Sequence, residues 1–239
     1  MRLDKFLSVT AVASRKESAR AVRAGEVTIN GTPARRADEP IDPENDRVVF
    51  RGVSVRYKAF DYLLLNKPEG YVSATEDGKS PTVLALLPER FAARGVFPCG
   101  RLDKNTTGLM LLTNNGELSH RLLAPRRHVP KRYRFTVKFP LSAADLAAIE
   151  AGLTLDDGYR TKPAAIELSD ERNGVITLVE GKYHQIKRMM ETLHNQITAL
   201  ERVSFGPLTL PADLPRGAWR ELKDDEIAAL FAAAEMDKQ

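Results

Sequence analysis

The stretch Gly100-Arg101-Leu102-Asp103-Lys104-Asn105-Thr106-Thr107-Gly108-Leu109 is a polar turn that leads into an apolar run. Gly100 permits a tight turn, and Leu102 offers an apolar anchor. Residues 108–113 predict a buried strand that would hold the turn rigidly. A carboxylate fixed in this way, Asp103, is a candidate nucleophile or base, because catalysis depends on fixed geometry. The alternative is a surface ion pair between Asp103 and Arg101, worth about 0 to 1 kcal/mol.

Composition bounds the class of protein. The chain has 239 residues, enough for one core and a small appendage, and is 43% hydrophobic and 28% charged. No apolar run approaches the roughly 20 residues that span a bilayer, and the first residues lack the apolar core of a signal peptide. The single Cys99 excludes an internal disulfide. We therefore expect a cytoplasmic protein without a membrane partner.

Positive charge is clustered in two places. Residues 1–36 contain eight Lys or Arg and three acids, and residues 119–140 contain seven Lys or Arg and no acid. Clusters of this kind bind phosphate backbones, with an affinity that falls as salt rises. A polyanion such as RNA is the expected partner.

The N-terminal segment predicts a small α/β module. Leu3, Phe6 and Leu7 have helical spacing, Ser14 with Glu17 predicts a capping box, and Asn30-Gly31 after the apolar residues 27–29 predicts a hairpin turn. Residues 48–50 predict a later strand, and residues 51–58 predict a polar linker.

One face of the second predicted helix is basic. Lys16, Arg20 and Arg23 recur at positions i, i+4 and i+7. Periodicity alone fits a solvated face as well as it fits an RNA-binding face.

The middle of the chain predicts short strands separated by turns. Residues 62–65 form an apolar run, residues 66–70 (Asn-Lys-Pro-Glu-Gly) predict a turn, and residues 71–73 predict another strand. A short helix is expected over residues 82–87, ending at Pro88, and another over residues 117–123.

Two later segments bring further functional side chains. Residues 131–137 alternate as a strand with Tyr133, Phe135 and Val137 on one face. Tyr133 suits either the core or stacking on an unstacked base, while its neighbouring arginines suit phosphates. Residues 184–193 predict a helix whose apolar face carries Met189 and Met190. Its opposite face carries His184, Lys187, Arg188 and Glu191.

Four ordered motifs and the N-terminal module resemble one family. Residues 1–56 resemble an S4 domain, a compact RNA-binding module. The sequences Asn-Lys-Pro-Glu-Gly-Tyr (66–71), Gly-Arg-Leu-Asp-x-x-Thr-Thr-Gly-Leu (100–109), Lys-Arg-Tyr (131–133) and Glu-Gly-Lys-Tyr-His-Gln-Ile-Lys-Arg-Met (180–189) resemble the RsuA-type ribosomal RNA pseudouridine synthases. The resemblance spans nearly the whole chain.

The resemblance implies a reaction and roles for residues. These enzymes break the N1–C1′ bond of a uridine, rotate the uracil and rejoin it through C5, without metal or cofactor. The implied catalytic residues are Asp103, Tyr133, which would stack on the base, and Lys187, which would pair with the aspartate, with Arg188 as a rival. Arg101 would fill the gap left by the flipped base. The other implied substrate or RNA contacts are His184, Lys131, Asn66, Lys67, Lys16, Arg20 and Arg23, with a structural role for Asn66 and Lys67 left open.

The resemblance also implies the fold, the domains and the partner. We expect an α+β protein with a small S4 (α-L) domain over residues 1–56, and a catalytic domain over residues 57–239 with a mixed, largely antiparallel sheet flanked by helices. The expected partner is ribosomal RNA or a pre-ribosomal small-subunit particle, bound by a monomer. The residues around Ser119-His120-Arg121 and Pro125-Arg126-Arg127-His128 favour 16S over 23S rRNA.

Other chemistries find little support in the residues. The four histidines and Cys99 lack metal-ligand spacing, and no Gly-rich nucleotide motif is present. Two alternatives stay open: a non-catalytic RNA-binding or ribosome-assembly protein, and a small-molecule enzyme with a basic surface.

Overall fold

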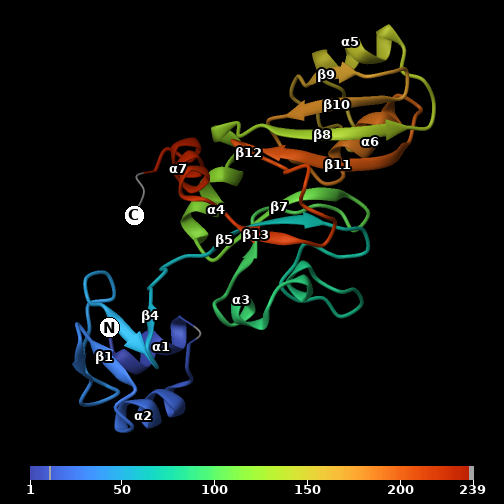
Figure 1. The fold of residues 1–239 in the computed structure, drawn as a ribbon. Coiled ribbons are helices and arrows are strands. Elements are labelled where there is room, and N and C mark those ends of the chain that lie inside the picture. The colour runs from blue at the N-terminus through green and yellow to red at the C-terminus, as the bar shows by residue number, and fades with distance from the viewer. Residues whose placement is uncertain (11, 237–239) are drawn as a thin grey trace. The chain divides into compact units, whose positions relative to one another are not determined.

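The structure is a computed structural model and describes residues 1–10 and 12–236. The chain divides into two compact units, Met1–Phe60 and Asp61–Gln239. Each unit has its own elements, drawn in Figure 1 from blue in the first unit to red at the end of the second. In the described residues, no helix has the length and apolar character needed to cross a membrane.

The first unit packs two helices against a small sheet. Its helices are α1 (Leu3–Val9) and α2 (Arg15–Arg23), and its sheet has the order β2 (Thr32–Pro33), β1 (Val27–Ile29), β3 (Val48–Phe50) and β4 (Val53–Val55). The side chain of Ser14 accepts a hydrogen bond from the Glu17 N–H and so caps α2. Asn30 and Gly31 have φ angles of 52° and 82°, as an Asn-Gly hairpin requires. The N-cap at Ser14 and the Asn-Gly hairpin are confirmed, whereas the reciprocal half of the predicted capping box is not formed, because the Glu17 carboxylate pairs with Arg51.

The expected polar linker over residues 51–58 is wrong in part. Arg51 and Gly52 have φ angles of 48° and 80°, so they form a second tight hairpin turn. The chain returns as β4, which pairs with β3 through Val48 and Val55. Tyr57 then stacks on Phe6 with the ring centroids 6.1 Å apart. These residues therefore pack with the first unit, although Val53 and Ser54 are exposed and give no apolar alternation to reveal the strand.

The second unit is built on one twisted sheet. Its nine strands are β5 (Tyr62–Lys67), β6 (Phe97–Pro98), β7 (Thr107–Thr113), β8 (Lys131–Val137), β9 (Ala165–Leu168), β10 (Asn173–Leu178), β11 (Ile197–Phe205), β12 (Leu208–Thr209) and β13 (Trp219–Glu221). The main order is β13-β5-β7-β11-β8-β10-β9, and β6 and β12 pair with β7 and β11. Among the paired strands of the described residues, only β7 and β11 run parallel. The sheet is thus mixed and largely antiparallel, which confirms the predicted fold class.

Helices cover the faces of this sheet (Figure 1). They are η1 (Val83–Leu86), α3 (Glu89–Ala93), α4 (Gly116–Leu123), η2 (Pro125–Arg127), α5 (Ala143–Ala151), α6 (Gln185–Thr192) and α7 (Asp224–Ala233). Helices α4 and α7 pack on one face of β5 and β7, whereas η1 and α3 pack on the other. Strands β5 and β7 read as continuous apolar runs because both of their faces are buried. Helices α5 and α6 cover the half of the sheet formed by β8, β10 and β11.

Three local predictions for residues 66–87 differ from the structure. Strand β5 continues through Asn66 and Lys67, where a turn was expected, because both residues pair with β7. Residues 71–73 form no strand but a single bridge between Val72 and Thr82. The helix expected over residues 82–87 is the one-turn η1. Leu87 is already extended, with φ −110° and ψ 154°, as the residue before a proline prefers.

Strands β7 and β11 approach each other unusually closely at Gly108. A Cβ atom at this position would lie 2.3 Å from the carbonyl oxygen of Arg202, and the φ angle of 98° also favours glycine. The glycine of the opening motif thus lets the two halves of the sheet join just beyond the Asp103 turn.

Candidate active site

A buried lysine holds the turn that carries Asp103. Lys67, at the end of β5, has no exposed surface, and its Nζ donates hydrogen bonds to four carbonyl oxygens. The acceptors are those of Pro68 (3.1 Å), Asp103 (3.1 Å), Lys104 (3.2 Å) and Thr106 (2.8 Å). Burial lowers the pKa of Lys67 to about 8. The cation therefore fixes the backbone of the turn and cannot reach RNA in this structure.

Further hydrogen bonds fix the same turn from the opposite side. The Ser73 hydroxyl donates to the Leu102 carbonyl at 2.7 Å and accepts from the Leu102 N–H at 3.0 Å. The Gly70 N–H donates to the Lys104 carbonyl at 3.0 Å. The residues expected to be a separate strand, 71–73, thus act as a brace for the Asp103 turn.

The carboxylate of Asp103 faces two basic groups of the β10–α6 segment. Lys187 Nζ lies 2.6 Å from Asp103 Oδ2, and His184 Nε2 lies 3.4 Å from Oδ1. The side chains of Asp103 and Lys187 are 26% and 27% exposed, so the pair is only partly screened by water. His184 caps α6 in a left-handed conformation, and its ring stacks on Tyr183 with centroids 3.8 Å apart.

Arg188, the alternative to Lys187 as partner of Asp103, forms ion pairs with other carboxylates. Its guanidinium pairs with Asp156 and, at 2.8 Å, with Asp157. These contacts raise the pKa of Arg188 further. One step along α6 separates the two cations by about 100° around the helix axis, which explains why only Lys187 faces Asp103.

Glu180 is buried and holds the segment before α6 in place. It was not among the site residues predicted from the sequence. The Glu180 carboxylate accepts hydrogen bonds from the Tyr159 hydroxyl (2.7 Å), the Lys162 N–H (3.0 Å) and the Gln185 side-chain amide (2.6 Å). It therefore holds the start of α6, and with it His184 and Lys187, against the rest of the sheet. Its only signal in the sequence was its place at the start of the 180–189 motif.

Asp103, Tyr133 and Lys187 line one cavity of about 90 Å³. It shares Asp103 and Tyr133 with a larger cavity of about 850 Å³, within the range of about 300 to 1,000 Å³ that is usual for small-molecule sites. Tyr133 is half-buried on β8, opposite Ile176 on β10 and Arg202 on β11. The Thr106 hydroxyl, also on the small cavity, is buried and has no hydrogen-bond partner in the structure.

The larger cavity is strongly positive. Six Lys or Arg line it against two acids, Asp103 and Glu180. Arg101 is exposed at this cavity and, in the part of the chain that the structure describes, forms no ion pair with Asp103. Lys131 is instead 8% exposed, and its Nζ donates to the Val129 carbonyl at 3.0 Å. Lys131 therefore belongs to the cavity wall rather than to an exposed surface, and its contact with RNA stays a prediction.

Asn66 also has a structural place. Its amide donates to the Leu214 carbonyl at 2.8 Å, and its Oδ1 accepts from Arg216 at 2.8 Å. Asn66 is 6% exposed. The contacts of Asn66 and Lys67 support the structural role that the sequence left open, and a direct contact of either with RNA stays a prediction.

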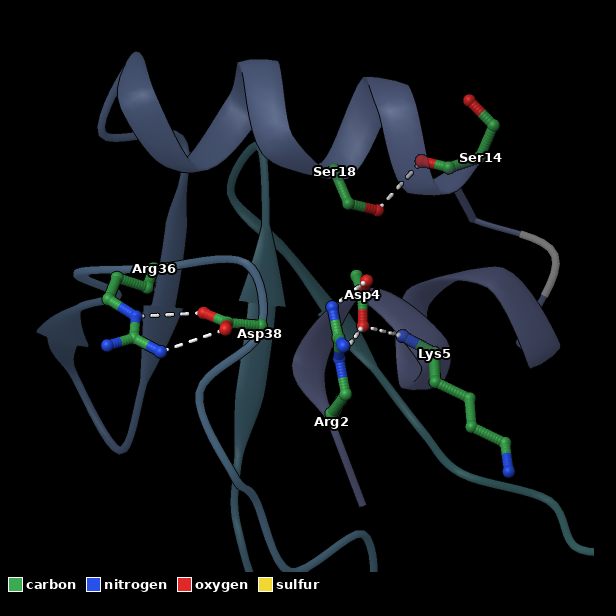
Figure 2. Close-up of polar contacts among 7 residues, drawn as sticks. All are labelled: Arg2, Asp4, Lys5, Ser14, Ser18, Arg36 and Asp38. Atoms are coloured by element: carbon green, nitrogen blue, oxygen red, sulfur yellow. Dashed lines mark hydrogen bonds and ion pairs between the residues drawn. The ribbon is translucent and has the colours of Figure 1, made fainter.

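In the first unit, Lys16, Arg20 and Arg23 are all exposed on α2. Two other cations of this unit are paired with acids, as Figure 2 shows: Arg2 forms two hydrogen bonds with Asp4, and Arg36 two with Asp38. Asp4 is buried and also accepts from the Lys5 N–H, while the Ser18 hydroxyl donates to the Ser14 carbonyl. The basic face of α2 is therefore open to a polyanion.

No group of three or more metal-ligating side chains occurs within residues 1–10 and 12–236. Cys99 is fully buried, and burial raises the pKa of its thiol. The chemistry available at the site is that of a carboxylate fixed by an ion pair beside an aromatic ring.

Comparisons with known proteins agree with this arrangement. Residues 61–192 match the RNA pseudouridylate synthase family, and residues 1–48 match the S4 domain. An uncharacterized RNA pseudouridine synthase of Bacillus subtilis, YtzG, is 44% identical over 96% of this chain and 98% of its own. Ribosomal small subunit pseudouridine synthase A of Yersinia pestis is 41% identical (97% and 99% covered), and that of Escherichia coli K12 is 38% identical (96% and 100% covered).

A solved structure is similar over nearly the same length. The crystal structure of a pseudouridylate synthase superposes with a TM-score of 0.69 at 34% identity and covers 96% of this chain and 99% of its own. The family match, the full-length relatives and the shared fold agree with one another. The chain is therefore a member of the S4-domain, RsuA-type family of pseudouridine synthases, which are isomerases.

Proposed function

We propose that this enzyme converts one uridine of 16S rRNA to pseudouridine, with Asp103 as the reacting carboxylate. The observation that carries the proposal is the ion pair between Asp103 and Lys187 in a cavity that Tyr133 also lines. Two relatives that match nearly the full chain are named for the small ribosomal subunit, which supports the 16S target.

The reaction is an isomerisation, so the atoms of substrate and product are the same. The N1–C1′ bond breaks, the uracil turns within the site, and a new bond joins C5 to C1′. The proton on C5 is lost, and N1 gains a proton. Asp103 would either add to the sugar or act on a glycal-like intermediate, and both routes need the carboxylate held in place, which the 2.6 Å contact with Lys187 supports.

The other residues would bind and position the nucleotide. Tyr133 would stack on the extruded uracil. Arg101, exposed and without a carboxylate partner among the described residues, would fill the space that the flipped base leaves. The S4 unit would hold structured RNA through Lys16, Arg20 and Arg23. We assign RNA binding to residues 1–56 and catalysis to residues 57–239, in a protein that acts as a monomer.

The test uses small-subunit rRNA transcript incubated with the wild-type enzyme or with Asp103→Asn. Pseudouridine at one position with the wild type and none with the variant supports the proposal. Equal pseudouridine in both samples refutes the role of Asp103. Modification of 23S but not 16S transcript would make the large subunit the target instead.

A further inference from the structure

Two cations beneath the active site are buried against one aromatic ring. Arg202 is 2% exposed and Lys131 is 8% exposed. The Arg202 Cζ lies 5.2 Å from the centroid of Phe205, and the Lys131 Nζ lies 5.6 Å from the same centroid. A β-bulge in β11 between Arg202 and Ser204 lets both Arg202 and Phe205 point into the core. The fold therefore places two positive charges, those of Lys131 and Arg202, against the same ring.

Neither cation has a counter-charge in the part of the chain that the structure describes. Lys131 donates to the Val129 carbonyl, and Arg202 donates to the Leu109 carbonyl at 2.7 Å and to Met110 Sδ at 3.8 Å. Burial, and then the positive charge of Arg202, lower the pKa of Lys131 to about 8. Cys99 lies near both cations, but burial raises the pKa of its thiol, so it supplies no negative charge.

Buried charges without partners are costly and are normally paired with an opposite charge or a ligand. These two cations also keep unused donors. The ammonium of Lys131 has three N–H bonds and makes one hydrogen bond. The guanidinium of Arg202 has five N–H bonds and makes two. Both side chains line the cavity of about 850 Å³ that Asp103 and Tyr133 also line. An anion entering this cavity would meet them.

We infer that Lys131 and Arg202 form a buried anion site that binds a backbone phosphate flanking the target uridine. The site rests on the proposed function, because RNA is the ligand that brings phosphates to this cavity. Lys131 and Tyr133 lie two residues apart on the same face of β8, about 7 Å along the strand. A nucleotide whose base stacks on Tyr133 therefore has its phosphate group within reach of Lys131. The phosphate would set the depth of the nucleotide in the cavity.

The first experiment uses inorganic phosphate as the probe and needs no RNA. Thermal unfolding of the full chain is followed at fixed pH and ionic strength while phosphate replaces chloride, for the wild type, Lys131→Met and the control Lys79→Met. Lys79→Met removes the same positive charge as Lys131→Met. Because Lys79 is exposed and its side chain has no partner among the described residues, this control tests the effect of net charge alone. We expect phosphate to raise the Tm of the wild type and of Lys79→Met equally, and the Tm of Lys131→Met by less than half as much. Equal shifts in all three proteins would overturn the site.

The second experiment measures steady-state kinetics on RNA. For Lys131→Met we expect the KM to rise at least tenfold with kcat changed less than threefold, and the slope of log KM against log salt to fall by about 0.7 to 0.9, the loss of one phosphate contact. Arg202→Lys, which keeps the buried charge, should raise the KM less and serves if Lys131→Met does not fold. An unchanged KM in both variants, or a loss confined to kcat, would contradict the inference.

The two proposals can fail separately. If the wild type modifies no 16S uridine yet its phosphate-dependent shift requires Lys131, the proposed target is wrong and the anion site stands. If the wild type modifies 16S rRNA and the phosphate shift is the same in Lys131→Met, the anion site is wrong and the function stands.

Discussion

Lys187 Nζ lies 2.6 Å from the Asp103 carboxylate, whereas the adjacent Arg188 pairs with Asp156 and Asp157 on the far side of the helix. The two cations are adjacent in sequence but form ion pairs with different carboxylates. In the proposed mechanism Lys187 therefore orients the reacting carboxylate, whereas Arg188 anchors α6.

The first prediction separates these two roles. Lys187→Met should lower kcat on rRNA by about 10²-fold or more, because the carboxylate loses the positive charge that orients it in the cavity. Lys187→Arg should recover part of the rate. The matched control is Arg188→Met, which should lower the Tm while kcat stays within about threefold of wild type. If Arg188→Met lost as much kcat as Lys187→Met, the assignment would be wrong.

A second prediction concerns Thr106, which lines the small cavity and whose buried hydroxyl has no hydrogen-bond partner among the described residues. Leaving a buried hydroxyl unpaired costs about 1 to 3 kcal/mol, so we expect the bound nucleotide to pair with it. Thr106→Val, which keeps the shape, should lower kcat/KM by about tenfold, and Thr106→Ser should restore it. Thr107→Val is the control, because the Thr107 hydroxyl already donates to the Leu200 carbonyl. Full activity in Thr106→Val would refute a contact with the substrate.

The pH dependence of stability provides a third prediction. The pKa of Lys131 falls from 10.5 to about 8 on folding, because burial disfavours its charge. Between pH 8 and 10.5 the unfolded chain therefore holds more protons than the folded chain, and the contribution of Lys131 to stability rises with pH. Below pH 8 the burial of the charged Lys131 lowers the free energy of unfolding by its full amount, up to about 3 kcal/mol.

The comparison of wild type with Lys131→Met isolates this effect. The free energy of unfolding of Lys131→Met minus that of wild type, measured in urea without phosphate, should become smaller as the pH rises from 8 to 10. Lys79→Met should show no such trend relative to wild type. A difference independent of pH would mean that Lys131 titrates normally in the folded protein.

The fourth prediction tests the basic face of α2. Replacing Lys16, Arg20 and Arg23 together with Gln should weaken binding of rRNA and reduce the slope of log affinity against log salt by about 2 to 3, since each phosphate contact contributes about 0.7 to 0.9. Arg36→Gln is the control, because Arg36 is already paired with Asp38. A salt slope unchanged in the triple variant would place the RNA on another surface.

Much of the fold could be predicted from local patterns. Leu3, Phe6 and Leu7 gave the first helix its buried face, and the apolar run of β7 gave the strand after Asp103. The hairpin at Arg51-Gly52 was missed, because an arginine with positive φ has no distinctive signature and β4 exposes two of its three residues. The brace at residues 71–73 was mistaken for a strand, since its pairing depends on Leu102 across the fold.

The candidate site divides in the same way. Asp103, Tyr133 and Lys187 follow from motifs, and the structure brings them to one cavity. The burial of Lys67, Lys131 and Arg202 could not be predicted from sequence, because a lysine or arginine in a strand gives no sign of whether its charge is buried. Their burial arises from the packing of β5, β8 and β11 within one sheet, which is a property of the tertiary fold.

The most direct test of the central claim is a map of pseudouridines in the rRNA of a strain that lacks this protein, complemented with the wild type or with Asp103→Asn. We predict that one 16S pseudouridine disappears in the deletion strain, returns with the wild type and stays absent with Asp103→Asn at equal protein level. Its return with Asp103→Asn would contradict the account, as would a deletion that leaves every 16S pseudouridine in place.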